Sequence, residues 1–248
     1  MKILVIGEVC VDTFVYSDAK RLSPEAPVPV LNPIKSVNNP GMAGNTAANV
    51  KALAPESIVS IISQTEEITK TRYVEDKSNH MFLRVDRGEN NITQFKWSMD
   101  IDVMLGKADI VIVSDYNKGF LTTADIKEIS KKSKLSIIDS KRRLTNDVIK
   151  DFTFVKLNEL ERNSNPDLTT DNIITTLGKR GAEYQNITFP SPKPQDTIDV
   201  SGAGDTFTSS FIIKFHQLQD VGTAIKFANR KAAEVVSKRG VSTPTYEK

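Results

Sequence analysis

The chain has 248 residues, a formal net charge of +2 and one cysteine, a composition that is ordinary for one large α/β domain. Its basic residues are scattered, no apolar stretch approaches the length of a membrane span, and a single cysteine excludes an intramolecular disulfide framework. We therefore expect a cytoplasmic protein without nucleic-acid or membrane partners.

The first predicted element is a buried strand over residues 2–9, which makes Cys10 a core residue rather than a nucleophile. Asp12 follows this strand, at the edge where open α/β sheets bind their ligands, although a plain turn carboxylate fits the sequence at least as well. Residues 21–30 contain three prolines, which exclude a helix or a central strand. This segment is therefore predicted to be an edge strand or a stiff arm that forms part of a lid.

Residues 40–50 begin with small and turn-forming residues and continue with a helical pattern. Taken alone, the stretch also fits the start of an ordinary alanine-rich helix.

A hairpin is predicted from two strands, 69–74 and 81–86, after a short strand at 57–63. Lys70 and Arg72 point to the same side because they are two residues apart in a strand. They are either a phosphate-binding pair, since arginine presents a fork to phosphate oxygens, or part of a solvent-facing side of the strand.

Further strands are predicted at 110–113, 135–138 and 152–155 and at the start of 173–181, and polar residues follow each of them. Asp115, Lys118 and Lys141 are candidate ligand-contacting residues, although a plain surface lysine fits position 141 nearly as well. Asn158 and Glu161 are an amide and a carboxylate three residues apart, so they would share one helical face and suit water-mediated Mg²⁺ binding. Because strands alternate with helical patterns, we predict a mainly parallel, doubly wound sheet with helices on both faces.

Residues 199–206, Asp-Val-Ser-Gly-Ala-Gly-Asp-Thr, place three small residues directly before an apolar helical pattern. Small side chains let backbone N–H groups approach a ligand closely, and a helix N-terminus attracts anions. Asp205 would then lie at the edge of a phosphate-sized pocket, where a carboxylate is tolerated if it handles a proton. The same residues also suit an aspartate N-cap after a glycine-rich turn, and the octapeptide alone does not separate the two interpretations.

Four segments together resemble the ribokinase/PfkB family of carbohydrate kinases. Residues 199–206 fit the second signature of that family, D-[TV]-[TS]-G-A-G-D-[TA], at all eight positions. Residues 40–50 resemble its first signature, with Met42 in place of a glycine. Residues 21–30 and 114–119 resemble motifs of one subgroup, the bacterial D-glycero-β-D-manno-heptose-7-phosphate kinases.

The resemblance implies that Asp205 is the general base and that the backbone of Gly202, Ala203 and Gly204 forms the anion hole for the transferring phosphoryl group. It implies sugar or sugar-phosphate contacts at Asp12, Gly41, Asn45, Lys70, Arg72, Asp115 and Lys118. It implies contacts with ATP and Mg²⁺ at Asn158, Glu161, Thr176, Gly178, Gly181 and Asn229. It also implies a monovalent cation, with K⁺ as the candidate, held by Asp199 and Ser201.

The resemblance covers nearly the whole chain and implies one ribokinase-like sugar kinase domain over 1–248, with a small β lid whose strands lie within about 12–35 and 69–98. Two internal deletions set the chain apart: a helix and a strand that usually precede residue 69 are missing, and the stretch 162–170 is short. We expect a homodimer through the lid. Because the sequence ends at Lys248, we also expect the kinase domain without the second, nucleotidyl-transferring domain that the subgroup often has.

The expected activity is ATP-dependent phosphorylation of a sugar or sugar-phosphate hydroxyl, most specifically the anomeric hydroxyl of D-glycero-β-D-manno-heptose 7-phosphate. The replacement at Met42 and the two deletions leave two alternatives open. One is a kinase for another sugar or for a nucleoside. The other is a trimmed domain that binds a sugar or nucleotide without turning it over.

Overall fold

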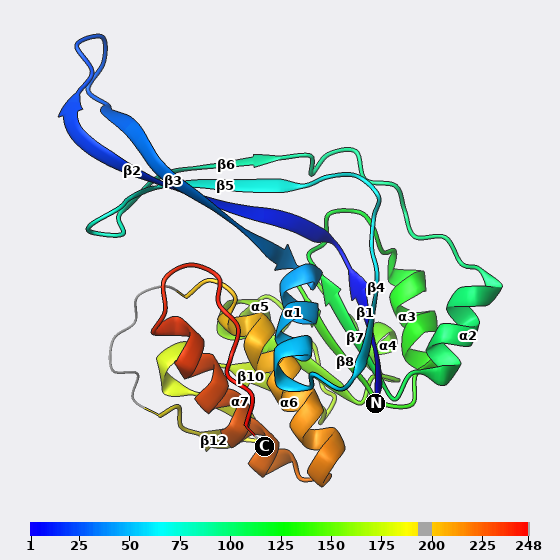
Figure 1. The fold of residues 1–248 in the computed structure, drawn as a ribbon. Coiled ribbons are helices and arrows are strands. Elements are labelled where there is room, and N and C mark those ends of the chain that lie inside the picture. The colour runs from blue at the N-terminus through cyan, green and yellow to red at the C-terminus, as the bar shows by residue number, and fades with distance from the viewer. Residues whose placement is uncertain (193–199, 248) are drawn as a thin grey trace.

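Strands from both halves of the chain build one large sheet (Figure 1). Its strands are β1 (Lys2–Gly7), β4 (Ile58–Ile62), β7 (Ile110–Asp115), β8 (Ser136–Ser140), β9 (Phe154–Asn158), β10 (Ile173–Thr176), β11 (Ala182–Tyr184) and β12 (Ile187–Phe189). The computed structural model describes residues 1–192 and 200–247, and within them this sheet has eight strands in the order β12-β11-β10-β9-β8-β7-β1-β4. Neighbours from β10 to β4 run parallel, whereas β11 and β12 add antiparallel strands at one end.

Helices cover both faces of this sheet, which is why its central strands are apolar along their length. One face carries α1 (Ala43–Leu53), α6 (Ala203–Leu218) and α7 (Val221–Val236), and the other carries α2 (Met99–Lys107), α3 (Thr123–Lys132) and α4 (Asn146–Ile149). The short helices α5 (Glu159–Asn163) and η1 (Gly178–Arg180) follow β9 and β10. Val5 of β1 joins the first core and Ile6 joins the second, as side-chain alternation requires. The predicted doubly wound, mainly parallel fold is confirmed, and among the described residues no helix is long and apolar enough to cross a membrane.

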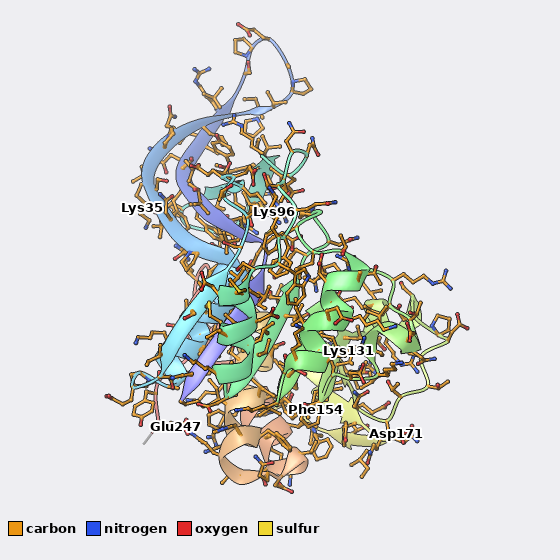
Figure 2. All side chains as sticks on the ribbon, turned by 90° about the vertical axis from the view of Figure 1, so that its right-hand side faces the viewer. Lys35, Lys96, Lys131, Phe154, Asp171 and Glu247 are labelled. Carbon is orange, nitrogen blue, oxygen red and sulfur yellow. The ribbon has the colours of Figure 1, made fainter. Side chains whose placement is uncertain are left out.

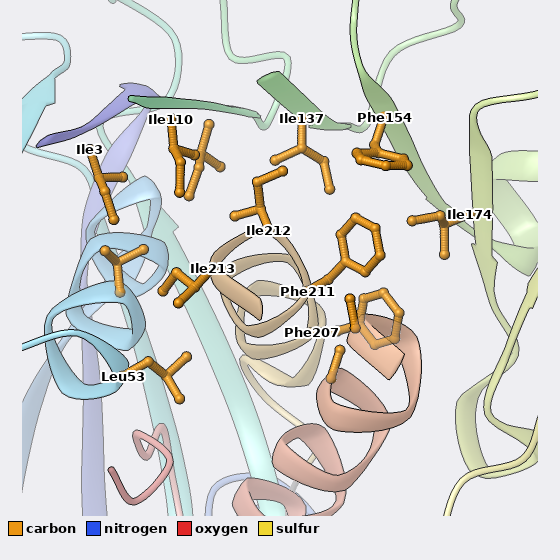
Figure 3. Close-up of a cluster of buried hydrophobic side chains, with 14 of the residues drawn as sticks. Ile3, Leu53, Ile110, Ile137, Phe154, Ile174, Phe207, Phe211, Ile212 and Ile213 are labelled. Carbon is orange, nitrogen blue, oxygen red and sulfur yellow. The ribbon is translucent and has the colours of Figure 1, made fainter. Parts of the chain in front are cut away.

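Aromatic side chains organise the core beneath α6 (Figure 3). Phe211 of α6 is fully buried and meets Phe154 of β9 edge to face, with ring centroids 4.8 Å apart. Phe207 and Phe215 lie one turn away on either side and stack on Phe211. The apolar pattern after residue 206 therefore anchors α6 against the sheet and fixes the position of its N-terminus.

A second sheet forms the lid, and in the described part of the chain its strand order is β3-β2-β5-β6. Its strands are β2 (Val9–Leu22), β3 (Pro29–Met42), β5 (Thr69–Glu75) and β6 (Met81–Arg87). Figure 2 shows the lid standing above the body of the molecule, with Lys35 on the lid and Lys131 on helix α3. The first two lid strands begin before and end after the predicted range of 12–35. The lid strands end before residue 98, because residues 88–98 contain no strand.

The proline-rich segment lies at the far tip of the lid (Figure 1). Residues 23–28 form the turn between β2 and β3, and Ser23 N donates to Val28 O at 2.8 Å across its base. The exclusion of a helix and of a central strand is confirmed. The segment belongs to the lid, as expected, and Pro29 begins β3, which is an edge strand of the lid sheet. Pro24 and Pro27 instead occupy the turn, where no strand partner needs their missing N–H.

The chain passes from β4 to β5 through residues 63–68 without a helix or a further strand. Strand β4 is therefore at the edge of the large sheet, and Ile58 and Ile61 are exposed there. This agrees with the predicted deletion, which removes material from the sheet edge and leaves the central strands in place.

We predict that Phe211→Ala lowers the free energy of unfolding by about 3–5 kcal/mol, because truncating a fully buried aromatic side chain leaves a cavity that its neighbours fill only in part. The matched control is Leu160→Ala, since Leu160 is 78% exposed and its truncation removes little packing. Urea unfolding of both variants measures the difference. Equal stability of the two variants would contradict the central position of Phe211 in this core.

Candidate active site

The N-terminus of α6 begins with a glycine that no other residue can replace without strain. Gly202 caps the helix with φ of 80°, and a Cβ at this position would lie 2.6 Å from Asn45 Nδ2. The N–H of Ala203 donates to Val200 O over 3.3 Å. The N–H of Gly204 comes before the first helical hydrogen bond, so it belongs to the group of donors that an anion can bind.

Asp205 lies in the first turn of α6 and is only 6% exposed. Asn45 donates through Nδ2 to its Oδ2 at 2.7 Å, and Tyr116 donates through its hydroxyl to Oδ1 at 3.1 Å. Thr46 Oγ1 lies 3.3 Å from the same Oδ1. All three donors are neutral, so they orient the carboxylate without neutralising its charge.

Burial raises the pKa of Asp205 to about 6, and the negative charge of Asp139 adds to this rise. The hydrogen bonds from Asn45 and Tyr116 and the positive charge of Lys156 offset part of it. The carboxylate is therefore ionised at neutral pH, yet it takes up a proton more readily than an ordinary aspartate. These are the properties of a general base, which works best when its pKa is near the operating pH.

Two buried residues at the strand ends complete this charge network, and neither is among the predicted site residues. Lys156 of β9 is 2% exposed, and its Nζ lies 2.8 Å from Oδ2 of Asp139 on β8. A Cβ on Gly204 would lie 3.2 Å from Lys156 Nζ, so the lysine lies directly against the backbone that opens α6. The signal that identifies Lys156 is its charge inside the buried strand sequence Phe-Val-Lys-Leu-Asn.

A cavity of about 390 Å³ opens beside the N-terminus of α6, between α7 and the turn after β10. It brings four of the six residues predicted to contact ATP or Mg²⁺ together with Gly204 of the predicted anion hole. These residues are Thr176, Gly178, Gly181 and Asn229. The apolar part of the wall includes Phe207, Ala232, Ala233 and Val236. An apolar wall with backbone N–H groups at one end suits a nucleotide base and its phosphates.

Asn158 and Glu161 lie outside the lining of this cavity and form the cap of α5. The Asn158 side chain accepts from Glu161 N, and Glu161 Oε2 accepts from Asn158 N, both at 2.8 Å. Asn158 is therefore the N-cap, and the two side chains lie together at the start of α5, although Asn158 itself precedes the helix. Glu161 Oε1 also lies 2.5 Å from Lys141 Nζ, which is 5.7 Å from the centroid of the Tyr116 ring.

Metal binding is restricted by the small number of clustered ligands. In residues 1–192 and 200–247, no group of three His, Cys, Asp or Glu side chains is arranged to hold a metal ion. Of the predicted ligands for a monovalent cation, Asp199 lies outside the described residues and Ser201 lies in the turn before α6, so that site stays a prediction.

Asp12, Gly41 and Arg72 meet where the lid joins the body. Asp12 Oδ1 lies 2.5 Å from Nη1 of Arg72, and both side chains are mostly buried. A Cβ on Gly41 would collide with the Asp12 carboxylate and lie 2.5 Å from Cys10 Sγ, so glycine lets β3 pack against β2. Burial raises the pKa of Cys10 to about 12, as expected for a core residue. Met42, which replaces a signature glycine, packs against Cys10 in the interior.

Lys70 of β5 and Lys118, which follows β7, converge on one carboxylate. Lys118 Nζ lies 2.5 Å from Glu89 Oε2, and Lys70 Nζ lies 3.3 Å from Glu89 Oε1. Lys70 Nζ is also 5.7 Å from the centroid of the Tyr116 ring, whose hydroxyl donates to Asp205. The structure thus brings two predicted substrate-contacting lysines together close to the candidate base.

Asp115 has both carboxylate oxygens occupied by neighbouring side chains. It is completely buried at the end of β7, and Arg142 grips it with Nε 2.5 Å from Oδ2 and Nη2 2.8 Å from Oδ1. Ser140 Oγ also donates to Oδ2. The predicted substrate contact at Asp115 is therefore corrected, because this carboxylate ties β7 to the residues at and after the end of β8.

Comparison with known proteins agrees with this geometry. The model of a family described as pfkB family carbohydrate kinase matches residues 47–248. Bifunctional protein HldE from Nitratiruptor sp. is 27% identical over 296 aligned positions, which cover 99% of this chain and 63% of that protein. This chain therefore spans less than two thirds of that relative's length. The alignment is also longer than the chain, so the relative carries additional residues within the shared region.

Solved structures share the fold at low sequence identity. Ribokinase from Thermotoga maritima has a TM-score of 0.73 at 17% identity, covering 96% of this chain and 94% of that one. Phosphofructokinase-2 from Escherichia coli has a TM-score of 0.72 at 12% identity, covering 98% and 95%. The predicted ribokinase-like fold is confirmed.

We predict that Asp205→Asn makes the protein more stable at about pH 8, because the wild type keeps a buried carboxylate ionised there. The pKa of Asp205 is about 6 in the folded protein and has the ordinary value of 3.8 in the unfolded chain. As the pH falls through about 6, the folded wild type binds a proton at Asp205, and the free-energy cost of a buried charge disappears. The advantage of the variant should reach at most about 3 kcal/mol and should shrink below pH 6.

Urea unfolding at about pH 8 and about pH 5 measures this difference. The control is Glu56→Gln, which removes an exposed carboxylate and should show no such pH-dependent gain. A stability difference between Asp205→Asn and the wild type that stays constant over this range would show that Asp205 does not have a raised pKa.

Proposed function

Because the chain belongs to the pfkB family of carbohydrate kinases, we propose that it transfers the terminal phosphoryl group of ATP to a hydroxyl group of a sugar or sugar phosphate. The observation that carries this proposal is Asp205, a buried carboxylate with a pKa of about 6 at the start of α6, beside a nucleotide-sized cavity. Phosphoryl transfer needs a group that takes the proton of the acceptor and donors that stabilise charge on the transferring group. Asp205 and the N–H groups that open α6 fit these two roles.

In the proposed reaction, Asp205 accepts the proton of the acceptor hydroxyl. The oxygen of that hydroxyl attacks the γ-phosphorus, and the bond between this phosphorus and ADP breaks. We assign stabilisation of the charge on the phosphoryl oxygens to the backbone N–H groups of Gly202 and Gly204 and to the dipole of α6, because the N–H of Ala203 already donates to Val200 O. Lys156 adds positive charge directly against this backbone. Mg²⁺ bound with ATP would neutralise phosphate charge, and we assign its water-mediated binding to Asn158 and Glu161.

The acceptor we propose is D-glycero-β-D-manno-heptose 7-phosphate, phosphorylated at its anomeric hydroxyl. Support comes from the subgroup motifs at 21–30 and 114–119 and from the similarity to Bifunctional protein HldE. Lys70 and Lys118 supply positive charge for a substrate phosphate near Asp205. Arg72 supports the subsite indirectly, because it is paired with Asp12.

We also propose a homodimer through the lid and a K⁺ site at Asp199 and Ser201. The lid exposes several large apolar side chains, which suits burial against a second copy. They are Leu22, Val28, Ile34, Val37, Met81 and Leu83. The cation proposal rests on the signature that contains both residues, and the phosphofructokinase-2 structure noted above was solved in complex with potassium.

A panel of sugars and sugar phosphates, incubated with ATP and followed by ADP formation, tests the function. We expect turnover with the heptose phosphate and a loss of about 10²–10⁴-fold in kcat for Asp205→Asn, because removing a general base costs about that much. Glu56→Gln should keep wild-type turnover. Undiminished ATP-dependent turnover in Asp205→Asn would remove Asp205 from its role, and sugar binding without ATP consumption would favour a non-catalytic binding domain.

We predict that kcat/KM falls about tenfold per pH unit below about pH 6, because Asp205 must be unprotonated to accept a proton. Asn45→Ala removes a hydrogen bond that lowers the pKa of Asp205, so in this variant the fall should begin at higher pH. Profiles of kcat/KM against pH for both proteins measure the effect. A wild-type profile that stays flat down to about pH 4 would mean that the catalytic base has an ordinary aspartate pKa.

A further inference from the structure

Two lysines from different parts of the fold hold Glu89. Lys118 Nζ is 2.5 Å from its Oε2 and Lys70 Nζ is 3.3 Å from its Oε1. The Glu89 side chain is 19% exposed, and within the described residues its Oε1 makes this ion pair but no hydrogen bond. By contrast, Arg72 and Asp12 pair one cation with one carboxylate. The cluster around Glu89 therefore holds two positive charges against one negative charge.

Glu89 reaches the lysines from an irregular connection rather than from a strand. Strand β6 ends at Arg87, and Gly88 turns the chain at φ +82°, where a Cβ would collide with the backbone carbonyl of Glu67. Residues 88–98 then run to α2 without regular secondary structure. The backbone is thus fixed at Gly88, while the Glu89 side chain can change rotamer. The carboxylate can leave the lysines without any movement of the lid.

A phosphate group matches the two lysines better than a carboxylate does. Burial opposes ionisation of Glu89, but the hydrogen bond from Lys118 and the charge of Lys70 outweigh it, and the pKa of Glu89 lies below its ordinary value. Glu89 therefore carries one full negative charge at neutral pH. A phosphate monoester carries about −1.5 to −2 at pH 7 and offers three strong acceptor oxygens. It can bind both ammonium groups through charge-assisted hydrogen bonds.

We propose that Glu89 is an internal substitute for the phosphate group of the substrate. The carboxylate occupies Lys70 and Lys118 until the phosphate of a sugar phosphate displaces it. A neutral sugar has no group that can displace it, so Glu89 makes the site select phosphorylated sugars over neutral ones. This inference rests on the proposed function, because it assigns a substrate class to the same site.

The position of the lysines relative to the base fits this assignment. Lys70 Nζ lies 5.7 Å from the centroid of the Tyr116 ring, and the hydroxyl of that ring donates to Asp205. A phosphate on the lysines and an acceptor hydroxyl at Asp205 can therefore belong to one small molecule that lies across Tyr116.

Inorganic phosphate is the probe for a direct test, by calorimetric titration of the full chain without nucleotide. Glu89→Gln should bind phosphate about tenfold more tightly than the wild type, because the competing carboxylate is removed. The double variant Glu89→Gln with Lys118→Met should lose this gain, which would assign the phosphate to the lysines rather than to the start of α6. Glu128→Gln removes the same charge from a surface pair with Lys131 and should match the wild type. Equal affinity of the wild type and Glu89→Gln would overturn the proposal.

Kinetic measurements keep this inference separate from the proposed function. Glu89→Gln should lower the KM for the sugar phosphate about tenfold, as for the affinity for inorganic phosphate, and leave the KM for ATP unchanged. Turnover of sugar phosphates with a KM that Glu89→Gln does not change would refute the inference and leave the function intact. Phosphate affinity that depends on Glu89, without turnover of any sugar in the panel, would refute the function and support the phosphate subsite.

Discussion

The candidate site depends on keeping one negative charge, that of Asp205, inside the protein. Burial works against this charge, and the three neutral donors around the carboxylate orient it without cancelling it. The arrangement persists because Phe211 anchors α6 in the core and so fixes where the first turn of the helix lies. The buried charge of Asp205 lowers the stability of the fold, and the same burial gives the carboxylate a proton affinity that suits catalysis near neutral pH.

Features that depend on local spacing could be predicted from the sequence. The apolar period after residue 206 predicted α6 and its buried phenylalanines, and the alternation in 69–87 predicted the lid hairpin, because periodicity reports directly on burial. That residues after β10 and on α7 come together was predicted from motifs in family order. Thr176 and Asn229 lie far apart in the chain, yet they line one cavity.

Pairing between distant side chains could not be predicted in this way. Asp115 follows the rule that polar residues at strand ends contact ligands, but Arg142, 27 residues away, occupies both of its oxygens. Lys156 stands out as a charge in an apolar strand, yet only the packing of β9 under α6 shows that it reaches Gly204. Helix α2 has no counterpart among the predicted elements, although Ser98 caps it, because its apolar residues make only a short pattern.

The trimmed edge of the large sheet affects how copies of this protein meet one another. Strand β4, with the sequence Ile-Val-Ser-Ile-Ile, has neither the charged residues nor the prolines that commonly protect an edge strand. Two copies of β4 aligned antiparallel about Ser60 would place apolar side chains opposite apolar side chains on either side of a central Ser60–Ser60 pair. Antiparallel pairing of this kind would use the free edge of both copies, so the extended sheet would close at two molecules.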